Sequence, residues 1–265
     1  MVFKNFKDFP SLVLTLLMTI YLGVTLPAVA QQDVDVVPPP PEEWPEPIKD
    51  DQPFWFLLFD RLEYGVNEGP DTILWDVQGW LGNDYNKLWI KTEGEQKVSA
   101  DNGGEGEVQA LYSRLIAPFW YFQIGGRYDK LYGKGSDPSR GFGVIGFEGL
   151  APYWYDVETA LFVSEDGDVS ARLEAEYELL FTQRLIAQPR FETNIAIQEV
   201  EKFGVGEGFN DVEIGLRLRY EIRREFAPYV GISWTRLLGD TADIARSEGE
   251  EVSNLAFVAG VRMWF

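Results

Sequence analysis

The feature that most constrains the fold is an alternation of side-chain character over residues 169–181. A helix would place residues three and four positions apart on one face and mix leucine with glutamate, whereas a strand separates the two sets. Strands of soluble β-sandwiches seldom exceed about ten residues. The alternation here covers thirteen residues, which matches a tilted strand that crosses a membrane. The apolar set is Val169, Ala171, Leu173, Ala175, Tyr177, Leu179 and Phe181, and the polar set is Ser170, Arg172, Glu174, Glu176 and Glu178.

The same alternation recurs along most of the chain. Residues 154–164 place Asp156 and Glu158 on the face opposite Leu161, and residues 210–223 separate apolar from charged side chains in the same way. The sequence therefore predicts an all-β fold, a transmembrane antiparallel up-and-down β-barrel of about twelve strands. Ten or fourteen strands remain open, because the first and fourth segments alternate poorly. The predicted strands are 54–64, 72–82, 86–95, 107–117, 120–129, 140–150, 154–164, 169–181, 185–198, 210–223, 228–237 and 254–265.

The predicted connections alternate in character. Three short ones share an Ala-Pro-aromatic sequence, at residues 117–120, 151–154 and 227–230. Aromatic rings gather at the membrane interface, so these turns are assigned to the periplasmic rim. Longer polar connections are assigned to the extracellular side, and they are 96–106, 130–139, 199–209 and 238–253.

Residues 1–30 have the three-part layout of a secretory signal peptide. A positively charged start precedes an apolar run at 12–26, and Ala28 and Ala30 form a small-x-small cleavage site. A retained membrane anchor is the alternative, but the run is shorter than the roughly twenty residues that a spanning helix needs. Residues 31–53 are rich in proline and acidic side chains and predict a disordered periplasmic tail. Residues 54–265 remain for the barrel.

The last predicted strand ends in an aromatic carboxyl terminus, Phe265. Alternate residues from Leu255 to Phe265 are apolar, which resembles the C-terminal signature that the barrel assembly machinery reads. Together with a signal peptide, this strand predicts export to an outer membrane of the Gram-negative type. Membrane lipid and the assembly machinery are the partners that follow from this location.

The composition disfavours several function classes. Asp plus Glu number 43 against 23 Lys plus Arg, so nucleic acid is not an expected partner. A cation-attracting lumen and solubilising acidic loops are both open as uses of this charge. The chain contains no His and no Cys, which removes the usual general base and the commonest metal ligand. We therefore expect no enzyme, no catalytic residue and no cofactor-binding residue.

The sequence also predicts a strand register inside the barrel. Strands 154–164 and 169–181 are joined by a short connection, which fixes which residues lie opposite one another. The predicted inward-facing neighbours are Glu158 with Glu174, Asp156 with Glu176, Arg190 with Glu176, and Glu192 with Glu174. Like charges placed opposite each other destabilise a sheet, so such pairs are seldom accidental.

We interpret these carboxylates as the wall of a cation path or an oxygen-ligand cation site. The candidate metal-interacting residues are Asp156, Glu158, Glu174 and Glu176. The alternative is a structural salt-bridge network that fills a narrow barrel. The basic residues of such a network would be Arg172, Arg190, Arg217 and Arg219.

Several segments resemble the copper resistance protein B family of outer-membrane proteins, in the expected order over about residues 55–265. They are DRLEY (60–64), WDVQGWLGNDYNKLWIKTEGE (75–95), EVQALYSRLIAPFW (107–120), GLAPYWYDVE (149–158), ARLEAEYELLFTQRL (171–185), LRLRYEIRREFAPYVGISW (216–234) and FVAGVRMWF (257–265). The resemblance implies an outer-membrane barrel with a role in copper homeostasis, through copper ion binding or passage. A periplasmic copper protein is a further partner that it implies.

The chain departs from the family in one respect. In many members a Met- and His-rich segment precedes the barrel, whereas residues 31–53 contain neither residue type. Copper favours sulfur or imidazole ligands, so the resemblance does not extend to tight copper binding. Two hypotheses follow: a passive or partner-gated metal-ion channel, and a docking barrel that engages a periplasmic metal protein through residues 31–53.

Overall fold

The computed structural model describes residues 52–98, 103–133 and 137–265. The predicted signal peptide (1–30) lies outside these residues, as does the predicted tail (31–53) apart from Gln52 and Pro53. The strands are β1 (Phe54–Val66), β2 (Thr72–Gly82), β3 (Asn86–Lys97), β4 (Gly104–Ala117), β5 (Trp120–Tyr132), β6 (Ser139–Ala151), β7 (Tyr155–Ser164), β8 (Val169–Glu176), β9 (Leu179–Leu180), β10 (Leu185–Ala196), β11 (Gly208–Tyr220), β12 (Phe226–Leu237) and β13 (Ser253–Trp264). The helical segments are η2 (Pro152–Trp154), η3 (Glu201–Phe203) and α2 (Gly239–Glu248).

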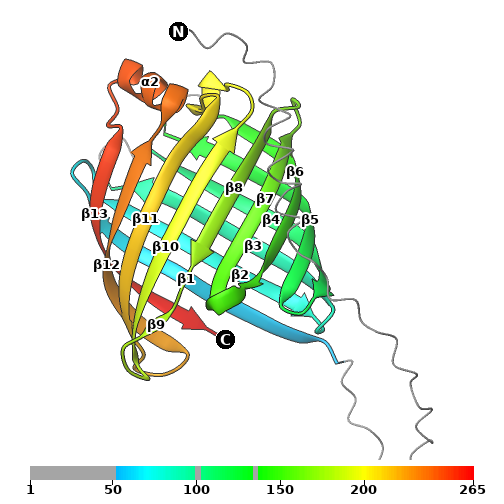
Figure 1. Ribbon diagram of the computed structural model, residues 1–265. Helices are drawn as coiled ribbons and strands as arrows, with labels where there is room; N and C mark the ends of the chain where they lie inside the picture. Colours follow the sequence, from blue (N-terminus) through cyan, green and yellow to red (C-terminus); the bar gives the residue numbers. More distant parts are fainter. Residues whose placement is uncertain (1–51, 99–102, 134–136) are drawn as a thin grey trace, which may run out of the picture. The chain divides into compact units, whose positions relative to one another are not determined.

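The sheet closes on itself. Successive strands pair antiparallel, and β1 also pairs with β13, with Tyr64 opposite Ala259. β9 is a two-residue continuation of β8 beside β10, so the wall has twelve strands. This confirms the predicted strand number. The strands surround a common interior, as predicted for a barrel (Figure 1). We call the end of the barrel at which β1 begins and β13 ends the terminal end, and the opposite end the loop end.

The predicted strand 169–181 is interrupted in the structure. β8 stops at Glu176, and strand pairing resumes only at Leu179. The amide of Tyr177 donates to the carbonyl of Pro189 on β10 at 3.2 Å. Pro189 has no N–H to return a bond, so the ladder is broken at this position while the register continues.

Two of the three predicted Ala-Pro-aromatic turns are confirmed. Residues 118–119 join β4 to β5, and η2 joins β6 to β7. The assignment of 227–230 to a turn was wrong, because these residues lie inside β12 and the connection is 221–225. Pro228 is close to the start of the strand, where a missing N–H is tolerated.

The connection predicted over 238–253 contains the helix α2. The hydroxyl of Thr241 accepts hydrogen bonds from the Gly206 amide at 2.9 Å and from the Asn210 side-chain amide at 2.8 Å. Gly249 ends the helix in the left-handed conformation that glycine adopts without strain. None of the helices in the described part of the chain has the length and apolar character needed to span a bilayer.

The two faces of the wall differ in polarity. On β11, Ile214 and Leu216 point outward and are 51% and 46% exposed, whereas Arg217 and Arg219 point inward and are 4% and 2% exposed. This matches the predicted division of residues 210–223. An apolar outside and a polar inside invert the arrangement of a soluble protein, and they suit a barrel surrounded by lipid.

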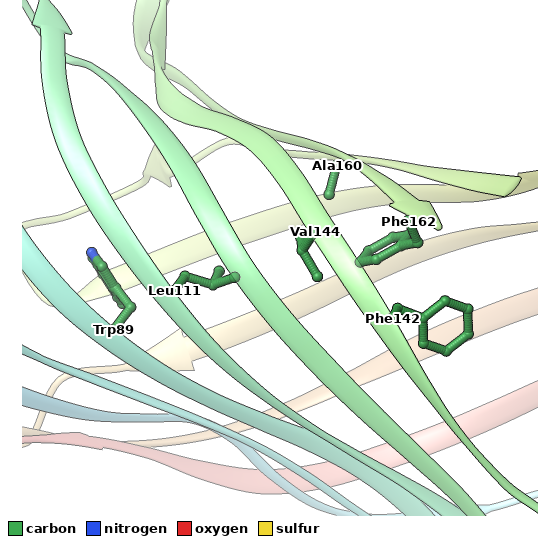
Figure 2. Packing of buried hydrophobic residues seen from close by; sticks show 6 residues of the cluster. All are labelled: Trp89, Leu111, Phe142, Val144, Ala160 and Phe162. Carbon is green, nitrogen blue, oxygen red and sulfur yellow. The ribbon is translucent and has the colours of Figure 1, made fainter. Parts of the chain in front are cut away.

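Part of the lumen is apolar. Inward-facing side chains of β3, β4, β6 and β7 pack into one buried cluster (Figure 2). Its members are Trp89, Leu111, Phe142, Val144, Ala160 and Phe162. Because this cluster fills one side of the interior, the polar free space lies beside it rather than along a wide central pore.

Candidate functional site

The predicted register is observed. Glu158 lies opposite Glu174 and Asp156 opposite Glu176 in the pairing of β7 with β8. β10 continues the row, with Arg190 opposite Glu176 and Glu192 opposite Glu174.

The four candidate residues line one cavity in the terminal half of the lumen, which we call the acidic cavity. Its volume is about 120 Å³. Its lining includes nine carboxylates and three basic side chains. The carboxylates are Asp60, Asp76, Glu93, Glu107, Glu148, Asp156, Glu158, Glu174 and Glu176, and the basic side chains are Lys91, Arg172 and Arg262. This excess of negative charge attracts cations.

The candidate carboxylates share a small number of basic partners. Lys91 contacts Glu158 at 2.6 Å and Glu148 at 3.1 Å. Arg190 contacts Glu174 at 2.9 Å and Glu176 at 3.2 Å. Asp156 is exposed at the terminal end and makes no ion pair within 4 Å to another described residue. Negative charge in the cavity is therefore only partly compensated.

The alternative interpretation, a salt-bridge network, also describes part of the lumen. Arg190 is 2% exposed and additionally contacts Glu192 at 2.5 Å and Glu213 at 3.4 Å. Arg217 pairs with Glu63 and Arg219 with Glu178. Buried charges of this kind require partners, so these arginines have a structural role.

Arg172 does not pair with the candidate carboxylates. It contacts Glu93 at 3.3 Å, Glu107 at 2.9 Å and Glu192 at 3.5 Å. These partners lie on β3, β4 and β10. Arg172 belongs to the lumen salt-bridge network, as the alternative interpretation predicts. Two of its partners, Glu93 and Glu107, lie on β3 and β4, where we predicted no site residue.

A second cavity of about 530 Å³ lies in the loop half of the lumen, and we call it the loop-end cavity. Residues near the loop ends of their strands line it, among them Lys97, Leu131 and Leu237. Three residues line both cavities, and they are Glu93, Glu107 and Arg172. The two cavities therefore meet at the ion pairs of Arg172.

The chemistry of the acidic cavity is that of oxygen donors. Among the described residues, no group of three or more Asp or Glu side chains is arranged to hold a metal ion. Carboxylate oxygens favour hard cations, and a charged wall raises the local cation concentration without fixing an ion at one position.

Sequence reasoning missed five of the cavity carboxylates. They are Asp60, Asp76, Glu93, Glu107 and Glu148. All lie on strands from β1 to β6, where we made no inward assignment. The alternating Lys91, Glu93 and Glu95 of the segment 86–97 carried a usable signal, because side chains two positions apart share one face of a strand.

A closed antiparallel barrel with an apolar exterior and a charged interior defines the class of outer-membrane β-barrel proteins. The chain is similar in fold to the NanC porin, with a TM-score of 0.50 and 12% sequence identity, over 78% of this chain and 98% of that chain. This likeness concerns the fold alone. The apolar exterior of this chain's own barrel agrees with the predicted outer-membrane location.

Sequence comparison gives the family. The family model described as copper resistance protein B precursor (CopB) matches residues 53–265. Copper resistance protein B of Escherichia coli is 41% identical over 211 residues, which cover 80% of this chain and 69% of that protein. The copper resistance protein B homolog of Pseudomonas syringae pv. tomato is 38% identical over 210 residues, covering 79% and 69%. The chain belongs to the copper resistance protein B family, which confirms the resemblance.

Proposed function

We propose that this protein is a non-enzymatic outer-membrane barrel that passes metal cations, copper among them, through its acidic lumen. The observation that carries the proposal is the acidic cavity of a barrel of this family. Its lining has nine carboxylates and three basic side chains, and Arg61 and Arg190 behind the lining offset only part of the excess negative charge. Passage requires attraction strong enough to draw cations in and binding weak enough to release them. A wall of shared carboxylates meets both conditions.

The donor set fits passage better than storage. The chain has no His and no Cys, and Met263, the one methionine after residue 30, does not line the acidic cavity. The cavity therefore lacks the sulfur and imidazole ligands that hold copper tightly. Carboxylates and amides such as Gln78 and Gln109 line the acidic cavity. A copper ion would be cargo in this lumen, not a resident cofactor.

The test is the ion selectivity of the purified barrel in planar bilayers, compared with that of the double variant Glu158→Gln/Glu174→Gln. The basic partners of the two glutamates are Lys91 and Arg190. Each keeps at least one carboxylate partner in the double variant, so the variant removes charge from the cavity without leaving a basic side chain unpaired. Lys91 keeps Glu148 at 3.1 Å, and Arg190 keeps Glu176, Glu192 and Glu213. Under the salt-bridge alternative, the sequence predicts that this change leaves Arg172 or Arg190 without a counter-charge. The observed contacts leave both arginines with carboxylate partners.

We expect the double variant to fold and to lose part of its preference for cations, because two fixed charges leave the cavity wall. The matched control is Glu165→Gln/Asp166→Asn, which removes two charges from the exposed connection of the same hairpin. A reversal potential that does not move in the first variant, measured across a salt gradient, would retire the cation path.

The filled lumen supports a second candidate. The apolar cluster and the buried arginines leave an acidic cavity of only about 120 Å³, which suits a docking barrel that does not conduct. In this version a periplasmic metal-handling protein binds the predicted tail, residues 31–53. A silent wild-type barrel, together with capture of such a protein that depends on residues 31–53, would favour docking.

A further inference from the structure

We infer that Arg172 is the constriction residue of the lumen, the side chain that divides the path into two compartments and sets its conductance. The inference rests on the proposed cation path and names the residue that limits it. The acidic cavity and the loop-end cavity have only three lining residues in common among those described, and Arg172 is the one that contacts the other two.

Arg172 crosses the interior instead of following the wall. It starts on β8 and reaches Glu93 on β3 at 3.3 Å and Glu107 on β4 at 2.9 Å. In the closed sheet, β4 to β7 lie between β3 and β8. Lys91 on β3 also spans the lumen, to Glu148 on β6 and Glu158 on β7, but it lines the acidic cavity and not the loop-end cavity. Arg172 lines both. A side chain that joins distant walls obstructs the space between them.

The contacts of Arg172 are redundant for charge compensation. Without it, Glu93 keeps its ion pair with Arg61, Glu107 keeps Arg127 at 2.7 Å, and Glu192 keeps Arg190 at 2.5 Å. Removing one partner of a buried pair is costly when the other charge is left alone, and here no carboxylate is left alone. The distinctive effect of Arg172 is therefore its position at the junction.

Its charge also bears on selectivity. A guanidinium keeps its charge at all physiological pH values, so a cation moving between the cavities passes a fixed positive group. The neighbouring carboxylates offset this repulsion. Removing Arg172 should widen the junction and make it more negative, and both changes favour cation flow.

The experiment compares Arg172→Ala with Arg140→Ala in planar bilayers. Arg140 lines only the loop-end cavity and contacts Asp129 on the neighbouring strand β5 at 3.8 Å. Asp129 keeps Arg127 at 2.5 Å when Arg140 is removed. Each variant thus removes one positive charge from the lumen, but only Arg172→Ala removes it at the junction of the two cavities. Heat-dependent electrophoretic mobility shows that each barrel is folded, and Arg172→Lys is the second variant if Arg172→Ala does not fold.

We expect a several-fold rise in single-channel conductance and stronger cation preference for Arg172→Ala, with little change for Arg140→Ala. Arg172→Lys keeps the charge with a shorter reach and should give an intermediate conductance. A silent wild-type barrel with a conducting Arg172→Ala barrel would also support the inference. A conducting wild type with unchanged Arg172→Ala, or equal rises in both alanine variants, would overturn it and leave the proposed function standing. Silence of the wild type and both alanine variants would overturn the cation path as well.

Discussion

The ion pair between Glu63 and Arg217 allows a quantitative test of how the lumen is stabilised. Both residues are 4% exposed. The Arg217 Nε donates to Glu63 Oε1 at 2.5 Å and its Nη2 to Oε2 at 3.2 Å. The Tyr229 hydroxyl donates to the same Oε1 at 2.9 Å. Among the described residues, each of the two charged groups has the other as its one ion-pair partner.

The single changes and the double change should differ sharply. Glu63→Leu leaves a buried guanidinium without a counter-charge, and Arg217→Met leaves a buried carboxylate, so each should cost about 3–5 kcal/mol of unfolding free energy. In the double variant both charges are gone, and the Tyr229 hydroxyl loses a bond worth roughly 1–3 kcal/mol if left buried and unpaired. The double variant should therefore be at least as stable as either single variant.

The assay is urea unfolding of barrels refolded into lipid vesicles, followed by tryptophan fluorescence. Arg224→Met is the control, because Arg224 is 78% exposed and lies 3.8 Å from Glu221, a kind of contact that contributes about 0–1 kcal/mol. Additive losses in the double variant, roughly 6–10 kcal/mol by the same estimate, would refute the reasoning. That result would mean that the two charges act independently.

Two further predictions concern export and copper. The mature protein should begin at Gln31, because Ala28 and Ala30 fit the small-residue subsites of signal peptidase; mass spectrometry of outer-membrane fractions that finds residues before Ala28 would contradict this. With no His or Cys and with Met263 as the one methionine after residue 30, the barrel should bind Cu(I) no better than a barrel without a copper role. Competition against a bicinchoninate-type chelator measures this, and submicromolar binding would contradict it.

The barrel and its local register were predictable because both depend on neighbours in sequence. Alternation assigns each side chain to a face, and the short connection after Ser164 fixes the pairing of β7 with β8. Gly167 has a φ of +91°, a conformation that glycine adopts at little cost. Glu158 and Glu174 could therefore be placed opposite each other without knowledge of the rest of the wall.

Contacts across the lumen were not predictable in this way. The partner of Glu158 is Lys91, 67 positions away, and the two meet only because the sheet closes. Strand tilt and stagger decide which inward side chains face each other across a barrel, and alternation carries neither quantity. The contact of Arg172 with Glu93 could not be predicted for the same reason. The helix α2 was missed for another reason, since its polar sequence has the composition of a loop.

The uneven charge of the lumen connects its stability to its proposed function. Where one carboxylate pairs with one basic side chain, as Glu63 does with Arg217, both side chains are buried. Where carboxylates outnumber basic side chains, as around Glu158, the structure keeps free volume. Uncompensated carboxylates in a confined wall repel one another, so they favour the entry of protons or mobile cations from solution. Such cations are shared among several oxygens and can move on. In the proposed function, an acidic cavity bounded by Arg172 passes metal ions without a resident metal, which agrees with a chain that has no histidine and no cysteine.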